Sequence, residues 1–221
     1  MLLKRSCDIL FAIIGLILSS VLFLILSILI KLDSKGPIFY MQMRVGQNRR
    51  RKERRAITTT ISEDRRNGDR RKLDSYGKPF VIYKFRTMSK DAEKKCGPVW
   101  ASDNDPRITP IGQILRYTNL DELPQLINIL KGDMSFVGPR PERPYFVSQL
   151  SNQIPGYINR LNIKPGLTGL AQVKTSCDYS LESVRNKLNY DLEYCNNGNL
   201  LSYFKIMFIT LFKIIMGKIN I

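Results

Sequence analysis

The sequence has no histidine, and its four cysteines, Cys7, Cys96, Cys177 and Cys195, are widely separated and form no CxxC pair. The usual ligand sets for structural zinc are therefore absent. The lack of histidine also excludes Ser-His-Asp and Cys-His nucleophiles, so carboxylates, lysines, tyrosines or a bound metal ion must carry any proton transfer or nucleophilic attack. We expect the cysteines to be free thiols in a reducing compartment.

Negative charge is also scarce. The 221 residues include 35 Lys and Arg against 19 Asp and Glu, which gives a net charge of +16. This excess predicts an anionic partner, such as phosphates, lipid headgroups or nucleic acid. The length has room for one compact domain with appendages.

A long stretch without charge occupies residues 9–30, ILFAIIGLILSSVLFLILSILI. Its 22 positions are enough for a helix to cross a hydrocarbon core about 30 Å thick. A cleaved signal peptide is the competing interpretation, but the run is long for one, and Lys31-Leu32-Asp33 is not a small-residue cleavage site. We expect a membrane helix within residues 1–36, followed by a catalytic domain at 37–221.

The charge distribution bears on how this helix sits in a membrane. Residues 1–30 carry +1 and the remainder carries +15, so a straight span would place positive charge on both sides, against the positive-inside tendency. A re-entrant helix would keep both ends cytoplasmic, and Gly15 with Ser19-Ser20 lies where such a helix could bend. A straight helix with mid-span serines is the alternative.

Residues 200–216, LLSYFKIMFITLFKIIM, form a second apolar segment, interrupted by Lys205 and Lys213. Its uninterrupted apolar length is too short to span a bilayer. The pattern favours an interfacial amphipathic helix in the headgroup plane. A helix buried in the protein core is the alternative.

Two strand-like runs, PIFYMQMRV at residues 37–45 and KPFVIYKFRTM at 78–88, predict a small β-hairpin. Residues 47–77 between them are predicted to be a flexible basic insertion, because residues 47–75 hold 11 basic and 5 acidic side chains and no regular period. The insertion could contact anionic lipid or be a solvated loop. It has no interleaved aromatic residues, so we expect no nucleic-acid partner.

The stretch NLDELPQLINILKGDMSFVGPRP, residues 119–141, places two adjacent carboxylates at the start of a predicted helix. The helix is indicated by an apolar stripe with i, i+3, i+4 and i+7 spacing, namely Leu123, Leu126, Ile127 and Leu130. Asp121 or Asn119 would be its N-cap, Pro124 fits only its first turn, and Gly132 would end it.

This position has chemical consequences for Asp121. A helix N-terminus favours an ionised carboxylate and attracts phosphate, and an ionised aspartate can attack phosphorus to give an acyl phosphate. Because both reactants are anions, the attack requires cations. Asp121 and Glu122 could bind Mg²⁺ through oxygen.

Basic residues could complete a phosphate site. Arg140 lies between two prolines with a planar fork of donors, and the other candidates are Lys84, Arg86 and Arg116. Each motif alone is more often structural, since acidic residues cap helices, Pro-Arg-Pro occurs in rigid turns and basic strand residues face solvent. Their occurrence together favours a phosphate site beside a membrane.

The motifs YKFRTM, DPRIT, LDELPQL, NILKGDMSFVGPRP, KPGLTGLAQV and DLEYC resemble those of the bacterial sugar transferase family, the monotopic polyprenyl-phosphate phosphoglycosyl transferases. The resemblance covers nearly the whole chain outside the insertion. It implies that a nucleoside diphosphate sugar donates its sugar phosphate to a polyprenyl phosphate and releases a nucleoside monophosphate.

The resemblance also implies residue roles. Asp121 corresponds to the covalent nucleophile, with Glu122 and Mg²⁺ beside it. The substrate-binding positions correspond to Lys84, Arg116, Arg140, Lys164 and Asp191. The chain departs from the family pattern at two places. Ser19-Ser20 replaces a Ser-Pro pair at the helix bend. Lys164-Pro165-Gly166 replaces Arg-Pro-Gly, so the point charge of a lysine ammonium stands in place of the two-pronged donor of an arginine.

We therefore expect an α+β, mainly helical protein with a re-entrant N-terminal membrane helix, a β-hairpin and a C-terminal interfacial helix. Its expected function is transfer of a sugar 1-phosphate from a UDP-sugar to undecaprenyl phosphate at the cytoplasmic face of a bacterial inner membrane, with release of UMP. This would be the first membrane step of surface glycan synthesis. The oligomeric state stays open, a homodimer included.

Two alternatives remain at this stage. One is a membrane-tethered module that binds anionic lipid or nucleic acid through its basic insertion, and the other is a catalytically silent scaffold. Deleting residues 48–74 separates the first, because an enzyme would keep Mg²⁺-dependent release of nucleoside monophosphate. Turnover of a donor would exclude the scaffold.

Overall fold

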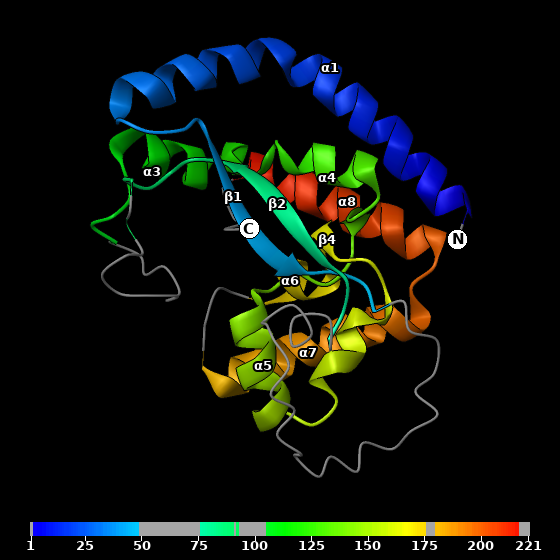
Figure 1. Ribbon diagram of the computed structural model, residues 1–221. Helices are drawn as coiled ribbons and strands as arrows, with labels where there is room; N and C mark the ends of the chain where they lie inside the picture. The colour runs from blue at the N-terminus through cyan, green and yellow to red at the C-terminus, as the bar shows by residue number, and fades with distance from the viewer. Residues whose placement is uncertain (1, 49–75, 91, 93–104, 176–179, 217–221) are drawn as a thin grey trace, which may run out of the picture.

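The computed structural model describes residues 2–48, 76–90, 92, 105–175 and 180–216 (Figure 1). The elements, in chain order, are α1 (Leu2–Asp33), β1 (Phe39–Val45), β2 (Pro79–Phe85), α3 (Pro110–Tyr117), the 3-10 helix η1 (Leu120–Glu122), α4 (Gln125–Lys131), β3 (Ser135–Val137), α5 (Pro144–Gln153), the 3-10 helix η2 (Tyr157–Asn162), β4 (Gly166–Thr168), α6 (Leu170–Lys174), α7 (Leu181–Asn197) and α8 (Leu200–Ile215). The predicted mainly helical α+β fold is confirmed.

Helix α1 is uninterrupted and arches along one side of the molecule (Figure 1). The Ser19 hydroxyl donates to the Gly15 carbonyl at 2.6 Å, a back-bond that often bends helices. Most large apolar side chains of α1 are exposed, and among the described residues it is the one helix long and apolar enough to cross a membrane. This surface is consistent with embedding in a bilayer.

Both ends of α1 are fixed to the rest of the chain. Near the N-terminal end, Arg5 donates to the Leu130 carbonyl at the end of α4 at 2.7 Å. At the other end, the buried Arg86 donates to the Ile30 carbonyl at 3.1 Å and to Ser34. The last carbonyls of a helix lack intrahelical donors and favour a nearby cation, so each arginine stabilises a helix C-terminus while it joins α1 to the protein.

The predicted hairpin is confirmed, with β1 and β2 antiparallel and Tyr40 opposite Lys84. The buried side chain of Asn128 on α4 is hydrogen-bonded to the backbone of β2. It accepts from the Tyr83 amide at 3.0 Å and donates to the Val81 carbonyl at 2.7 Å. Most of the predicted insertion, residues 49–75, lies outside the described residues. Two of the four cysteines, Cys96 and Cys177, also lie outside them. The other two, Cys7 and Cys195, are free thiols, as predicted.

The Pro-Arg-Pro segment is held by a short parallel pairing of β3 with β4. The Gly138 amide donates to the Thr168 carbonyl, and the Gly166 amide donates to the Pro139 carbonyl, both at 2.9 Å. A Cβ on Gly166 would come within 2.1 Å of the Gly138 nitrogen, so this close approach of two backbones requires glycine. The pairing fixes the backbone immediately before Arg140.

The predicted C-terminal helix is present as α8, which begins with a capping box between Asn199 and Ser202. Its inner face buries Tyr203 and Ile206, and its outer face leaves residues such as Phe208 exposed. The helix also meets α1, where the rings of Phe11 and Phe204 pack edge to face. A second apolar surface therefore lies beside that of α1.

Candidate active site

The two carboxylates lie on η1 and not at the α-helix N-cap that the sequence predicted. Asn119, with φ of 58°, makes no capping hydrogen bond through its side chain, and α4 begins only at Gln125. Pro124 is the physical cause, because it has no N–H to donate to Leu120, whose carbonyl accepts from Leu123 three residues on. The prediction that Gly132 ends α4 is confirmed by its left-handed conformation, with φ of 83°.

The turn that carries the carboxylates is packed against α1. Leu120 and Leu123, on either side of the pair, contact a buried cluster that includes Leu26 and Ile30 of α1. Asp121 and Glu122 are themselves buried, at 7 % and 4 % exposure. The carboxylates therefore lie beneath the apolar helix.

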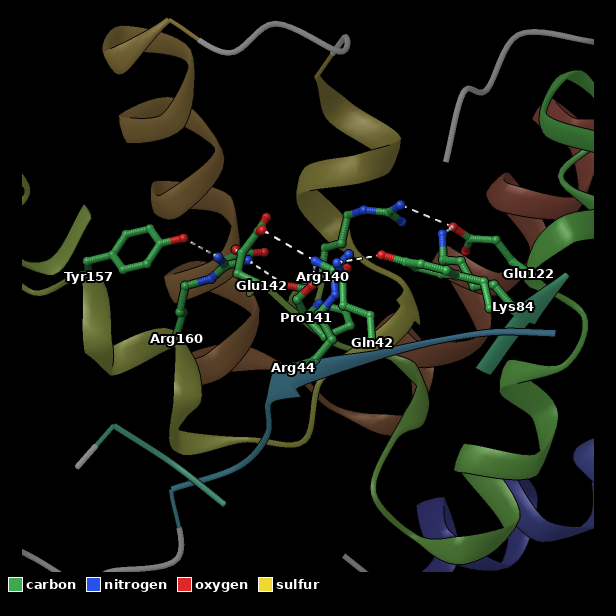
Figure 2. A network of polar contacts seen from close by, with 11 residues as sticks. Gln42, Arg44, Lys84, Glu122, Arg140, Pro141, Glu142, Tyr157 and Arg160 are labelled. Carbon is green, nitrogen blue, oxygen red and sulfur yellow. Dashed lines mark hydrogen bonds and ion pairs between the residues drawn. The ribbon is translucent and has the colours of Figure 1, made fainter. Parts of the chain in front are cut away.

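Basic side chains from two other segments contact Glu122 (Figure 2). The Lys84 ammonium, from β2, lies 2.6 Å from Oε1 of Glu122 and 3.8 Å from Oδ2 of Asp121. Nη2 of Arg140 lies 3.1 Å from the same Glu122 oxygen. The structure thus brings together four residues predicted from the sequence.

The two carboxyl groups are electrostatically different. Burial raises the pKa of Asp121 to about 6, with Lys84 opposing the rise and Glu122 adding to it. Burial also opposes ionisation of Glu122, but the charges of Lys84 and Arg140 outweigh it and lower that pKa to about 2. Glu122 is therefore ionised at neutral pH. Asp121 instead changes from the acid to the carboxylate at a pH close to neutral, as suits a group that takes part in a reaction.

Asp121 and Glu122 together form a candidate Mg²⁺ site. Oε2 of Glu122 is buried and has no hydrogen-bond partner in the described part of the chain. An orphaned carboxylate oxygen beside a second carboxylate fits a cation that takes one or two protein carboxylates and fills its other positions with water and substrate phosphates. No group of three or more acidic or thiol ligands occurs among the described residues.

A second buried network supports the backbone of Arg140 (Figure 2). Nη2 of Arg160, on η2, donates to the Arg140 carbonyl at 3.0 Å and pairs with Oδ2 of Asp191 on α7 at 2.8 Å. Nη1 of Arg160 donates to the Tyr157 hydroxyl at 2.6 Å. Asp191, predicted to bind substrate, is thus paired with Arg160, which in turn bonds the Arg140 carbonyl.

The remaining predicted residues are distributed unevenly. Arg116 lies close enough to lower the pKa of Asp121, and its Nε donates to Thr87 at 3.0 Å. Arg86 instead donates to the C-terminal end of α1. Lys164 lies near Gly132, at the end of α4 opposite the carboxylates. Neither Arg86 nor Lys164 is brought into the cluster.

Sequence reasoning missed Arg160 and Asn128. Arg160 has no proline or acidic neighbour in the sequence to single it out, and its partners Arg140 and Asp191 lie 20 and 31 positions away. Asn128 has one signal, because it is a polar residue within an apolar helical pattern. Such a residue is either exposed or hydrogen-bonded internally, and here it is fully buried and bonded to β2.

Comparison with known proteins identifies the family of the chain. A bacterial sugar transferase family model matches residues 1–217. The chain is 45 % identical over 159 residues to a putative undecaprenyl-phosphate N-acetylgalactosaminyl 1-phosphate transferase of Bacillus subtilis. The matched region covers 72 % of this chain and 73 % of that protein.

Two longer proteins match nearly all of the chain. A UDP-N-acetylgalactosamine-undecaprenyl-phosphate N-acetylgalactosaminephosphotransferase of Aeromonas hydrophila is 37 % identical over 97 % of the chain, and a UDP-glucose:undecaprenyl-phosphate glucose-1-phosphate transferase of Escherichia coli is 36 % identical over 98 %. The chain spans 44 % and 41 % of their respective lengths. By its motifs, its family match and these identities, the chain belongs to the bacterial sugar transferase family.

Proposed function

We propose that this protein transfers a sugar 1-phosphate from a UDP-sugar to undecaprenyl phosphate and releases UMP, as the first membrane step in the synthesis of a surface glycan. The names of its relatives support this class of reaction. One observation carries the proposal to particular residues: a buried carboxylate with a pKa of about 6 lies 3.8 Å from a lysine ammonium, beneath an apolar helix.

The proposed reaction has two displacements at one phosphorus. A carboxylate oxygen of Asp121 attacks the phosphorus that bears the sugar, the bond from that phosphorus to the UMP oxygen breaks, and UMP leaves with the bonding electrons. An oxygen of undecaprenyl phosphate then attacks the aspartyl phosphosugar and restores the carboxylate. Lys84 and Arg140 would neutralise the diphosphate, and Glu122 would hold both cations in place.

Magnesium is part of the proposal. Asp121 and the orphaned Oε2 of Glu122 would hold it. When bound, Mg²⁺ would offset the phosphate charge that otherwise repels a carboxylate nucleophile. The protein residues position the diphosphate and exclude water from the buried carboxylate.

We further propose that residues 1–36 form a re-entrant membrane element and residues 37–221 a catalytic domain at the cytoplasmic face of the bacterial inner membrane. Anchoring of both ends of α1 to one protein body supports this, because a straight span would carry one end across the bilayer. The exposed outer face of α8 supports an interfacial position. In sealed vesicles, cysteines placed at Leu2 and Leu32, each in a variant whose four native cysteines are replaced by serine, should react with impermeant maleimide from the same side, and labelling from opposite sides would contradict this topology.

The covalent step is tested without the acceptor. Purified protein incubated with Mg²⁺ and a UDP-sugar labelled in the sugar should release UMP only up to the amount of protein, and the label should stay on the protein. Adding undecaprenyl phosphate should move the label to lipid. Steady turnover only when both substrates are present, with no labelled protein, would contradict the two-step scheme.

The rate should depend on pH through Asp121. Its carboxylate fraction falls below a pKa of about 6, so the rate should decline about tenfold per unit at lower pH. In Lys84→Met the nearest cation is lost, and the acid limb should move upward by about one unit. Initial rates from pH 5 to 9 in both proteins measure this, and an acid limb in the same place would remove Lys84 from the electrostatics of the nucleophile.

A further inference from the structure

A cavity of about 450 Å³ lies beside the carboxylate cluster, lined by residues 40–43 of β1 and by residues 143–145 at the start of α5. Two of its lining residues are close to cluster residues in the sheet or along the chain. Tyr40 is the strand partner of Lys84, and Arg143 follows Arg140 by three positions. We propose, building on the reaction above, that this cavity binds the nucleoside of the donor and of the released UMP.

The chemistry of the lining fits a nucleobase. Two tyrosines, two methionines and a proline provide aromatic and polarisable surfaces on which a flat base can stack. Gln42 adds an amide, whose nitrogen donates to the Tyr40 hydroxyl at 2.6 Å, and amide groups match the donors and acceptors on the edge of a base. The volume is within the usual range for small-ligand sites.

The position of the cavity argues against the two other parts of the substrates. A polyprenyl chain would extend toward the bilayer, but α5 lies on the side of the hairpin away from α1 (Figure 1). A hexose presents hydroxyls on all sides, and the described residues that line the cavity include no carboxylate to accept from them. The nucleoside is the water-soluble part that combines a flat apolar face with a few polar atoms.

The positions of the cluster and of the cavity set the order in which the phosphates and the nucleoside of the donor would lie along the site. With the sugar-bearing phosphate at Asp121, the second phosphate would lie near Arg140, and the nucleoside would continue toward Tyr145. The backbone supports this direction, because Arg44 on β1 donates to the Pro141 carbonyl at 3.1 Å and so joins the cavity wall to the Arg140 turn. Donor recognition would thereby be coupled to the placement of the diphosphate.

The test compares UMP with inorganic pyrophosphate as probes on the purified full chain. Tyr145→Ala and Met43→Ala should each weaken UMP binding at least about fivefold, whereas pyrophosphate binding should stay within about twofold. Tyr145→Phe should retain UMP affinity, because it keeps the ring and loses only the hydroxyl that accepts from Gln149. Tyr117→Ala is the matched control, since this tyrosine is 70 % exposed on α3 and outside the cavity.

Three results would overturn the inference. Wild-type UMP affinity in both Tyr145→Ala and Met43→Ala, with donor turnover intact, would remove the nucleoside from this cavity and leave the proposed reaction standing. Altered preference among UDP-sugars at constant UMP affinity would place the sugar there. If the wild-type chain neither bound UMP nor turned over any UDP-sugar, the proposed function itself would fail. Met43→Ala provides the same test should Tyr145→Ala fail to fold.

Discussion

Asp121→Asn is expected to reduce UMP release by at least about a thousandfold and to abolish labelling of the protein by the donor sugar phosphate. An amide cannot form the acyl phosphate, and loss of a covalent nucleophile is among the largest single effects in enzyme catalysis. UMP release measured with saturating UDP-sugar and Mg²⁺ gives the magnitude.

The same change should not destabilise the fold. The pKa of Asp121 is raised by burial, so the folded state holds its proton more tightly than the unfolded state does. Stability from this group is therefore present at low pH and is lost as pH rises from about 4, the usual value, through about 6. At neutral pH a neutral amide should leave the melting temperature unchanged or raise it.

A matched control is available on α7. Glu193→Gln makes a carboxylate-to-amide change at an exposed position outside the site, away from the helix N-terminus, and should leave both turnover and melting temperature unchanged. If Asp121→Asn kept full turnover, the covalent scheme would have to be abandoned. A large fall in melting temperature would instead show that the carboxylate has a structural role.

The parts of the site that the sequence predicted are those set by local pattern. Two runs of strand length, rich in aromatic and β-branched residues, predicted the hairpin that carries Lys84, and glycine at position 132 predicted where α4 ends. The adjacency of Asp121 and Glu122 is a property of the chain itself. For these features, secondary structure decides which side chains share a surface.

The parts that it could not predict depend on where an element stops and on what packs against it. Lys84 and Arg86 are two residues apart, so a continuing strand would point both at the site, but β2 ends at Phe85 and Arg86 turns to the end of α1. The resemblance implied that Lys164 binds substrate. In the structure it lies near Gly132, at the end of α4 opposite the carboxylates. Such separations are set by tertiary packing.

Arg160→Met is expected to produce the largest loss of stability. Arg160 is 7 % exposed and is paired with the buried Asp191, so the substitution leaves a buried carboxylate without its ion-pair partner. Breaking a buried ion pair in this way costs about 3–5 kcal/mol, which for a chain of this size corresponds to a fall in melting temperature of roughly 6–20 °C. Thermal unfolding of the purified protein in detergent measures the loss.

The pH dependence and a double variant separate loss of the pair from loss of packing. Burial raises the pKa of Asp191 and Arg160 opposes that rise, so removing Arg160 should raise the pKa further. The Arg160→Met protein should therefore lose stability as pH increases through the range in which Asp191 ionises. Adding Asp191→Leu removes the stranded charge and should recover most of the loss, whereas Arg185→Met, an exposed change on α7, should be neutral within about 0.5 kcal/mol.

The double variant also tests whether this network positions the active site. Even with its stability recovered, it lacks the donor that holds the Arg140 carbonyl at 3.0 Å, so the Arg140 side chain should be less well placed against Glu122. We expect a higher KM for the UDP-sugar with a smaller change in kcat, because Arg140 would bind the diphosphate and does not itself react. Unchanged kinetics in a stable double variant would mean that the network maintains the fold alone.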